Sequence, residues 1–266
     1  MELERIIVTG ASRGIGEAIA YRLARRGNRL LLLARTERDL ERVSKRAREQ
    51  GADVEHRCVD LSRPEQVELL LDEIERNFGP VDALVLNAGV AHSRPFLETD
   101  LASMDYELRV NFGAPALFLR RILRQMIERD RGAVAVVGSL TSAVPFPGNA
   151  SYAATKAALF ALVRSLRLEL TSTNVHLGLV LPGFTATSMT AGMSSLLPAM
   201  SADDVARAVE RCLTKRRSLV VPGLINKVAL RLFSAAPELT DAVLARLPRP
   251  NPGARRWKRT LWPRVS

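Results

Sequence analysis

Short apolar runs alternate with longer segments of helical period along most of the chain, and this alternation restricts the fold more than any other feature. The runs occupy residues 6–8, 30–33, 54–59, 83–86, 133–137, 175–180 and 219–221. Nearly all of them are short and apolar enough to be strands buried on both faces. Strands separated by helices pair in parallel through right-handed crossovers. We therefore predict an α/β fold, a doubly wound parallel sheet of about seven strands with helices on both faces.

The segments between these runs have the length and spacing of helices. We place the helices at residues 16–27, 37–50, 64–78, 101–129 with a break allowed, 151–171 and 203–213. The carboxyl ends of the strands form the ligand crevice of such a sheet, so functional residues are expected in the loops there. We assign residues 1–222 to this domain and residues 223–266 to a helical, basic extension.

The positive charge of the chain is concentrated near its carboxyl end. The net charge is +11, yet twelve Lys and Arg but only two acidic residues lie from Lys215 onward. The rest is nearly neutral, which argues against a nucleic-acid-binding protein. Cys58 and Cys212 lie far apart without metal-ligand spacing, so we expect buried reduced thiols and no metal site. The acidic start and the lack of a long apolar stretch predict no signal peptide or membrane span, hence a cytoplasmic protein.

The loop after the first predicted strand has the chemistry of a phosphate-binding turn. It reads Thr9-Gly10-Ala11-Ser12-Arg13-Gly14-Ile15-Gly16 and leads into a helix. Glycines permit a tight turn and the close approach of a pyrophosphate, which backbone N–H groups and the helix dipole bind. The spacing is GxxxGxG and differs from the general dinucleotide fingerprint GxGxxG. The residues expected to contact a dinucleotide are Gly10, Ser12, Arg13, Gly14, Ile15 and Gly16.

The end of the second predicted strand distinguishes NAD(H) from NADP(H). An acidic residue there would bind the ribose 2′-hydroxyl of NAD, but this chain has Arg35. A guanidinium group can hold a 2′-phosphate through two hydrogen bonds, and Arg13 offers a second guanidinium group. We predict NADP(H), although Arg35 could also be a simple surface charge. Asp60, followed by Leu61, is placed to accept from the adenine amino group; the alternative is a helix cap.

Tyr152 and Lys156 lie four residues apart, on one face of a predicted helix. A free tyrosine titrates near pH 10, and a neighbouring ammonium group would lower its pKa. Such a pair is common by chance, but Ser139 ends the fifth predicted strand thirteen residues before Tyr152. The Ser139 hydroxyl could bind a substrate oxygen while Tyr152 donates or accepts its proton.

Together these motifs resemble those of the short-chain dehydrogenase/reductase family, over about residues 4–222. The resemblance rests on Thr9-Gly10, Gly14, Gly16, Asp60, Asn87-Ala88-Gly89, Asn111, Ser139, Tyr152, Lys156 and Pro182-Gly183. It implies a Rossmann fold and hydride transfer between a nicotinamide cofactor and a carbonyl or alcohol. It further implies that Tyr152 is the general acid/base, that Lys156 lowers its pKa and binds ribose, and that Ser139 polarises the carbonyl. The family's spacing favours Ser139 over Ser142.

The same resemblance implies roles for three further segments. Asn111 would hold a water that links Lys156 to solvent; alternatively it only caps or kinks its helix. The segment Asn87-Ala88-Gly89 would line the cofactor beside the fourth strand. The segment Pro182-Gly183, together with Thr185 or Thr187, would close over the nicotinamide carboxamide.

The segment after Gly183 is apolar and rich in methionine. No charged residue occurs from Phe184 to Met200, and three of the six methionines lie there. Thioether side chains repack around irregular apolar shapes, so we expect an adaptable lid over a hydrophobic substrate, such as a 3-oxoacyl, steroid-like or other apolar ketone. The alternative is that these side chains pack against the body or a partner subunit. The histidines, His56, His92 and His176, are interpreted as solvated or packed.

Residues 223–266 continue beyond the sheet. Residues 224–233 have an amphipathic stripe, a second helix is predicted from Pro237, and both tryptophans follow among arginines and lysines. This pattern fits peripheral contact with an anionic membrane, or packing on the body, the substrate mouth or a partner subunit; nucleic acid fits less well. We expect a homo-oligomer, a dimer or tetramer, that acts as an NADP(H)-dependent carbonyl reductase. The alternative is an NADP(H)-binding sensor or scaffold without useful catalysis.

Overall fold

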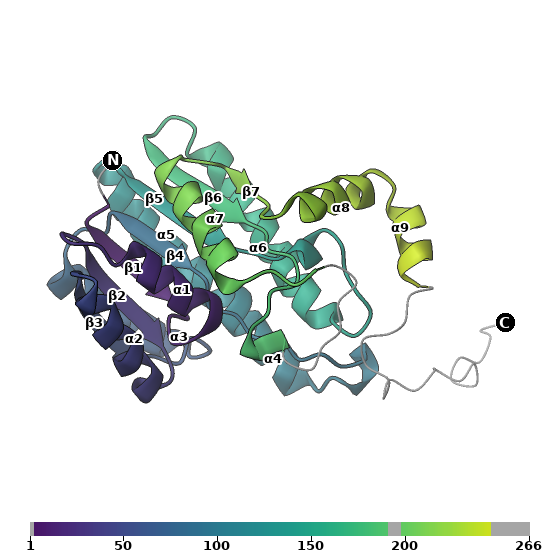
Figure 1. Ribbon diagram of the computed structural model, residues 1–266, viewed down its shortest axis with the longest axis horizontal. Coiled ribbons are helices and arrows are strands. Elements are labelled where there is room, and N and C mark those ends of the chain that lie inside the picture. The colour runs from purple at the N-terminus through teal and green to yellow at the C-terminus, as the bar shows by residue number, and fades with distance from the viewer. Residues whose placement is uncertain (1–2, 191–197, 246–266) are drawn as a thin grey trace.

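The structure, a computed structural model, describes residues 3–190 and 198–245. Within these ranges one sheet of seven parallel strands has the order β3-β2-β1-β4-β5-β6-β7 (Figure 1). The strands are β1 (Arg5–Thr9), β2 (Arg29–Ala34), β3 (Asp53–Cys58), β4 (Ala83–Leu86), β5 (Gly132–Val137), β6 (Val175–Val180) and β7 (Leu219–Val220). The predicted doubly wound sheet is confirmed.

The chain reverses direction across the sheet at β1, which pairs with β2 on one side and β4 on the other. Successive side chains of β1 point to opposite faces, so Ile6 and Val8 join one core cluster and Ile7 joins the other. The loops after β1 and β4 therefore diverge at the carboxyl edge of the sheet. A crevice at this switch point is the usual ligand site of such a fold.

Within the described part of the chain, six helices cover the two faces of the sheet. Apolar residues of α1 (Gly14–Leu23), α2 (Glu37–Glu49) and α7 (Ala202–Thr214) pack into one core cluster. Those of α3 (Pro64–Glu73), α5 (Ala114–Glu128) and α6 (Ala150–Glu169) pack into the other. Because each helix buries one apolar stripe against the sheet, the loops at the strand ends remain available for function.

The helix predicted at residues 101–129 is divided by a wide turn. Helix α4 (Leu101–Leu108) passes through a π-helical turn, Arg109–Gly113, into α5. A second π-helical turn, Ile74–Phe78, extends α3. Such turns often occur at functional sites, and the turn Arg109–Gly113 carries Asn111.

Two burial predictions are corrected by the structure. Strand β3 is not buried on both faces, because it is an edge strand and its side chains from Glu55 to Arg57 are only partly covered. Of the two cysteines, Cys212 is buried but Cys58, at the end of β3, is exposed. His176 is packed as expected, and burial, helped by the charge of Arg216, lowers its pKa to about 4.

The extension begins with two helices, α8 (Leu224–Ala235) and α9 (Pro237–Leu244), at one end of the molecule (Figure 1). Leu230 of α8 packs against a small cluster formed by Leu140, Leu181 and Val221. Asn226 is 4% exposed and donates a hydrogen bond to the carbonyl of Pro222 at 2.9 Å. One side of α8 thus packs on the carboxyl edge of the sheet. In the part of the chain that the structure describes, no helix is long and apolar enough to cross a membrane.

Candidate active site

A cavity of about 1220 Å³ lies at the carboxyl edge of the sheet. The loops after β1 to β6 contribute to its wall, together with residues of α8 and α9. Every predicted cofactor-binding residue lines it, and so does Ser139; Asn111 does not. Pockets for single small ligands span roughly 300–1,000 Å³, so this cavity has room for a dinucleotide and a substrate together.

The glycine loop has the shape that a bound pyrophosphate requires. Gly10 has a φ of +66°, and a Cβ on it would lie 2.8 Å from the Cα of Ala88. A Cβ on Gly16 would lie 2.0 Å from the carbonyl oxygen of Gly10. Neither position therefore accepts a side chain, and the loop presents bare backbone at the start of α1. This geometry fits a dinucleotide phosphate.

Hydrogen bonds to the end of β4 hold the glycine loop in place. The Thr9 Oγ1 accepts from the backbone N–H groups of Asn87 at 3.0 Å and Ala88 at 3.1 Å. The Asn87 side-chain amide donates to the carbonyls of Thr9 at 3.1 Å and Gly10 at 3.2 Å. Asn87 therefore braces the loop as well as lining the cavity.

The polar residues after β2 and β3 lie at one end of the cavity. The Arg35 guanidinium donates a hydrogen bond to the Tyr106 hydroxyl and lies 5.7 Å from the Tyr106 ring centroid. The Asp60 carboxylate accepts from the backbone and the hydroxyl of Ser62. Burial opposes the ionisation of Asp60, but these hydrogen bonds and the charge of Arg35 outweigh it and lower its pKa. Arg35 and Asp60 are thus both anchored beside the cavity.

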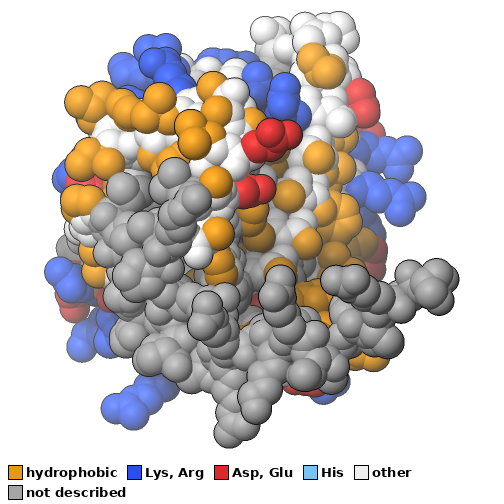
Figure 2. All heavy atoms as spheres, turned by 90° about the vertical axis from the view of Figure 1, so that its right-hand side faces the viewer, with side chains coloured by type: hydrophobic (Ala, Val, Ile, Leu, Met, Phe, Trp, Pro, Cys, Tyr) orange, Lys and Arg blue, Asp and Glu red, His pale blue; other side chains and the backbone are white. Residues whose placement is uncertain are grey.

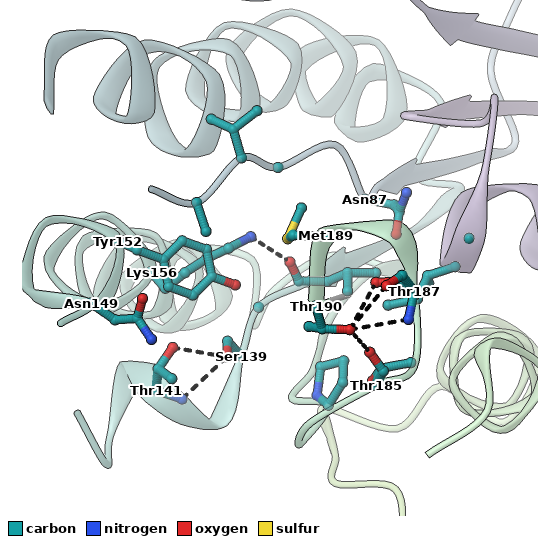
Figure 3. A pocket seen from close by; sticks show the side chains of 18 of the residues that line it. Asn87, Ser139, Thr141, Asn149, Tyr152, Lys156, Thr185, Thr187, Met189 and Thr190 are labelled. Carbon is teal, nitrogen blue, oxygen red and sulfur yellow. Dashed lines mark hydrogen bonds between the residues drawn. The ribbon is translucent and has the colours of Figure 1, made fainter. Parts of the chain in front are cut away.

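Three predicted catalytic side chains converge in the cavity (Figure 3). Tyr152 and Lys156 project from the first turns of α6, and Ser139 follows β5. The Lys156 Nζ donates to the carbonyl of Val137 at 3.1 Å and lies 5.9 Å from the Tyr152 ring centroid. The Ser139 Oγ accepts from the hydroxyl of Thr141 at 2.8 Å, which leaves its own proton available for donation.

The electrostatics of this group correct one expectation. Burial raises the pKa of Tyr152; the hydrogen bond with Ser139 opposes this shift and the charge of Glu107 adds to it. Burial also lowers the pKa of Lys156 to about 8. The net pKa of Tyr152 is therefore raised and not lowered as predicted, because desolvation dominates, and the effect of the Lys156 charge stays a prediction. At neutral pH, Tyr152 is a protonated phenol that can donate.

Asn111 lies behind the cavity wall, fully buried. Its Oδ1 accepts from the backbone N–H of Val90 at 2.8 Å, and its Nδ2 donates to the carbonyl of Val90 at 2.9 Å and to the Thr155 hydroxyl at 3.0 Å. A Cβ on Gly89 would lie 3.4 Å from both the Asn111 Oδ1 and the Lys156 Nζ. Asn111 thus ties the loop after β4 to α6, and its proton-relay role stays a prediction.

The loop after β6 is held by its own threonines. The Thr185 hydroxyl donates to the carbonyl of Gly183 at 3.1 Å, and the Thr190 hydroxyl donates to the carbonyl of Thr185 at 2.6 Å. The backbone N–H of Thr187 donates to the Thr190 hydroxyl at 3.1 Å. Met189 lines the cavity. Of the predicted lid, Met193, Leu196 and Leu197 lie outside the described residues.

Sequence reasoning missed several residues of the cavity wall. His92 and Tyr106 line it from the loop after β4 and from α4, and Asn149 lines it from the start of α6. The extension contributes Ala229, Leu230, Phe233, Leu244 and Ala245. The sequence pattern of these helices fits the substrate mouth as well as several other surfaces. Only their apolar stripe was visible in the sequence, and a stripe does not say what it contacts.

Comparisons with known proteins agree with this geometry. The residue pattern that describes short chain dehydrogenases matches residues 4–196. The 11-beta-hydroxysteroid dehydrogenase A of Arachis hypogaea is 37% identical over 187 residues, which are 70% of this chain and 53% of that protein. The 3-oxoacyl-[acyl-carrier-protein] reductase FabG of Escherichia coli (strain K12) is 32% identical over 188 residues, 71% of this chain and 76% of that protein. This chain spans about half the length of the Arachis relative and of a similar one from Sesamum indicum, 54% of whose length is matched.

Solved structures are similar over most of the chain. A short-chain dehydrogenase from Sphingobium yanoikuyae in complex with NADPH has a TM-score of 0.79 at 28% identity and covers 96% of this chain and 100% of its own. An alcohol dehydrogenase from Thermococcus sibiricus complexed with 5-hydroxy-NADP has a TM-score of 0.74 at 32% identity and covers 83% of this chain and 96% of its own.

Proposed function

The chain belongs to the short-chain dehydrogenase family, and from this premise we propose that it is an NADP(H)-dependent oxidoreductase that reduces the carbonyl of a hydrophobic substrate or oxidises the corresponding alcohol. The observation that carries the proposal is the convergence of Ser139, Tyr152 and Lys156 in one cavity with the glycine loop. Two observations support NADP(H) as the cofactor. Arg35 occupies the position at which an acidic residue would indicate NAD(H), and two similar structures are complexes with NADP-type cofactors.

The residues of this chain divide the work as follows. The glycine loop, Arg13 and Arg35 would hold the phosphates of NADPH, and Pro182-Gly183 with Thr185 or Thr187 would border its nicotinamide. The bound cofactor supplies a hydride. Tyr152 donates its proton to the carbonyl oxygen, while Ser139 donates a hydrogen bond to the same oxygen. The Lys156 ammonium stabilises the phenolate that remains, because an opposite charge nearby favours the ionised form.

The substrate part of the cavity favours a bulky apolar ketone. Val144, Phe146, Met189, Leu230 and Phe233 all line the cavity. Each buried CH₂ group contributes about 0.8 kcal/mol to binding, so a large apolar skeleton gains affinity here and a small keto acid does not. The names of the relatives, a hydroxysteroid dehydrogenase and a 3-oxoacyl reductase, support the same class.

Oxidation of NADPH, followed by its absorbance, tests this function across ketosteroids, 3-oxoacyl thioesters, aldehydes, quinones and small keto acids. We expect kcat/KM for bulky apolar ketones to exceed that for small keto acids by about tenfold or more, from the apolar area buried. A preference for small keto acids would contradict the substrate class. NADPH binding without turnover of any carbonyl would instead favour the sensor or scaffold.

We further propose that α8 lies on an anionic membrane surface. Leu224, Ile225, Val228 and Leu232 are between 49% and 76% exposed although they are large apolar residues. Lys227 and Arg231 of the same helix are also exposed. Figure 2 shows hydrophobic side chains beside Lys and Arg on the side of the molecule that carries α8 and α9. An apolar face with adjacent basic residues is typical of helices that bind anionic lipid.

Vesicle flotation tests this surface. The full chain should float with vesicles that contain phosphatidylserine, and Val228→Asp with Leu232→Asp should abolish flotation by placing charge in the apolar face. Leu168→Asp is the matched control, since Leu168 is an exposed leucine of α6. Equally poor flotation of all three proteins would contradict the proposal.

The expected dimer or tetramer also stays a prediction. A wild-type dimer that the double substitution dissociates would assign this face of α8 to a second copy of the chain instead of a membrane.

A further inference from the structure

A buried carboxylate next to the cavity has no role in the mechanism above. Glu107 of α4 is 0% exposed. Its Oε1 accepts from the backbone N–H of His92 at 2.5 Å and lies 3.2 Å from the His92 Nδ1. Its Oε2 is buried and has no hydrogen-bond partner among residues 3–190 and 198–245. Removing a carboxylate from water costs several kcal/mol, so Glu107 does not stabilise the fold as an apolar residue at this position would.

The contact with Glu107 determines how His92 can bind a ligand. A carboxylate only accepts hydrogen bonds, so the His92 Nδ1 must carry the proton that points to it. In the neutral ring, the Nε2 then remains as a hydrogen-bond acceptor. The His92 side chain is 33% exposed and His92 lines the cavity. Its ring centroid also lies 6.2 Å from that of Tyr106, so contacts on two sides orient the imidazole.

Two observations connect His92 with the catalytic end of the cavity. The hydroxyl of Ser93, the next residue, donates to the Asn149 Oδ1 at 3.0 Å. Asn149 lines the cavity and lies three residues before Tyr152. The charge of Glu107 is one of the causes that raise the pKa of Tyr152, which requires the two side chains to be near one another. His92 therefore lies on the cavity wall next to the start of α6, whose first turn carries Tyr152.

We propose that His92, oriented by Glu107, accepts a hydrogen bond from a substrate hydroxyl remote from the reacting carbonyl. This inference rests on the proposed function and narrows its substrate class from apolar ketones to apolar hydroxyketones. The physical reason is the contrast between one oriented acceptor and the apolar residues around it. In a mostly apolar pocket, a few placed polar groups set the orientation of the ligand, and a site built for a hydroxyl discriminates against the analogue that lacks it.

Two steroids that differ by one hydroxyl test the inference: 5α-androstan-3-one and 17β-hydroxy-5α-androstan-3-one. With the full chain and NADPH, we expect kcat/KM for the hydroxyketone to exceed that for the plain ketone by about tenfold, as one hydrogen bond contributes. His92→Leu should remove this ratio, mainly through KM for the hydroxyketone. Calorimetric titration of both steroids into the NADP⁺-loaded protein should show the same ratio in Kd.

Two further variants separate orientation from simple packing. Glu107→Gln keeps an acceptor for the His92 Nδ1 proton and should retain most of the kcat/KM ratio between hydroxyketone and plain ketone. Glu107→Leu removes that acceptor and should lose the ratio although His92 is still present. His56→Leu is the matched control, since His56 lies on β3 and pairs with Glu37.

Three results would overturn the inference: equal kcat/KM and Kd for the two steroids in the wild-type protein, an unchanged ratio in His92→Leu, or binding of neither steroid. In each case, turnover of other apolar ketones would leave the proposed function standing. If no ketone, steroid or other, supported NADPH oxidation, the proposed function itself would be contradicted.

Discussion

Replacing Tyr152 by Phe should lower kcat for ketone reduction by about a thousandfold, within the 10²–10⁴ range that a positioned general acid contributes. The substitution removes only the hydroxyl that donates the proton, and the ring that packs beside Lys156 is retained. Because burial raises the Tyr152 pKa, the wild-type phenol is protonated and competent at neutral pH. Single-turnover oxidation of NADPH measures the loss, and fluorescence titration should show that NADPH still binds.

A second tyrosine provides the matched control for this substitution. Tyr21 of α1 also has a hydroxyl in a hydrogen bond, with the Glu17 carboxylate at 2.8 Å, but it does not line the cavity. Tyr21→Phe should therefore leave kcat within about twofold, because losing one partly exposed hydrogen bond affects stability by only about 1 kcal/mol. If Tyr152→Phe kept more than about a tenth of the activity, Tyr152 would not be the acid, since that loss is below the usual contribution of a general acid.

The second large effect concerns the cofactor. Arg35→Ala should raise KM for NADPH between about tenfold and a hundredfold, because a hydrogen bond to a charged group contributes about 1.5–3 kcal/mol. KM for NADH should change little, since NADH has no 2′-phosphate for the guanidinium to hold. Steady-state kinetics with both cofactors on one ketone measure the two values.

The control for Arg35 is an arginine of the same helix start. Arg38 of α2 does not line the cavity, and Arg38→Ala should leave both cofactors unaffected. An equal rise of KM for NADPH and NADH in Arg35→Ala would mean that Arg35 only positions Tyr106, with which it forms a hydrogen bond. The assignment of Arg35 to the 2′-phosphate would then be wrong.

Much of the fold and most of the site could be predicted because their signals are local. A buried strand is a short apolar run, and a glycine that cannot accept a Cβ is still a glycine in the sequence, as Gly10 and Gly16 show. Tyr152 and Lys156 lie one helical turn apart, so their spacing alone places them on one face. Ser139 needed only the position of β5. The grouping of all these residues around one cavity then followed from the rule that ligands bind at the carboxyl edge.

Other features depended on contacts between segments far apart in the chain. The edge position of β3 is decided by strand order, and its mixed polar and apolar residues do not reveal which face is covered. The Tyr152 pKa depends on how deeply the folded chain buries the phenol, and the neighbouring Lys156 suggested the opposite shift. The role of α8 as part of the cavity wall depends on its packing against Leu140, Leu181 and Val221, which follow β5, β6 and β7.

The sequence by itself therefore determined the sheet, the glycine loop and the three predicted catalytic side chains, because each follows from periodicity or short spacing. Only the tertiary structure decided what surrounds them. It partly buried Tyr152, placed Glu107 in contact with His92 and placed the inner side of α8 on the cavity. Burial and the contacts between distant segments are properties of the packed chain, and they control the pKa values and the polar groups that a substrate meets.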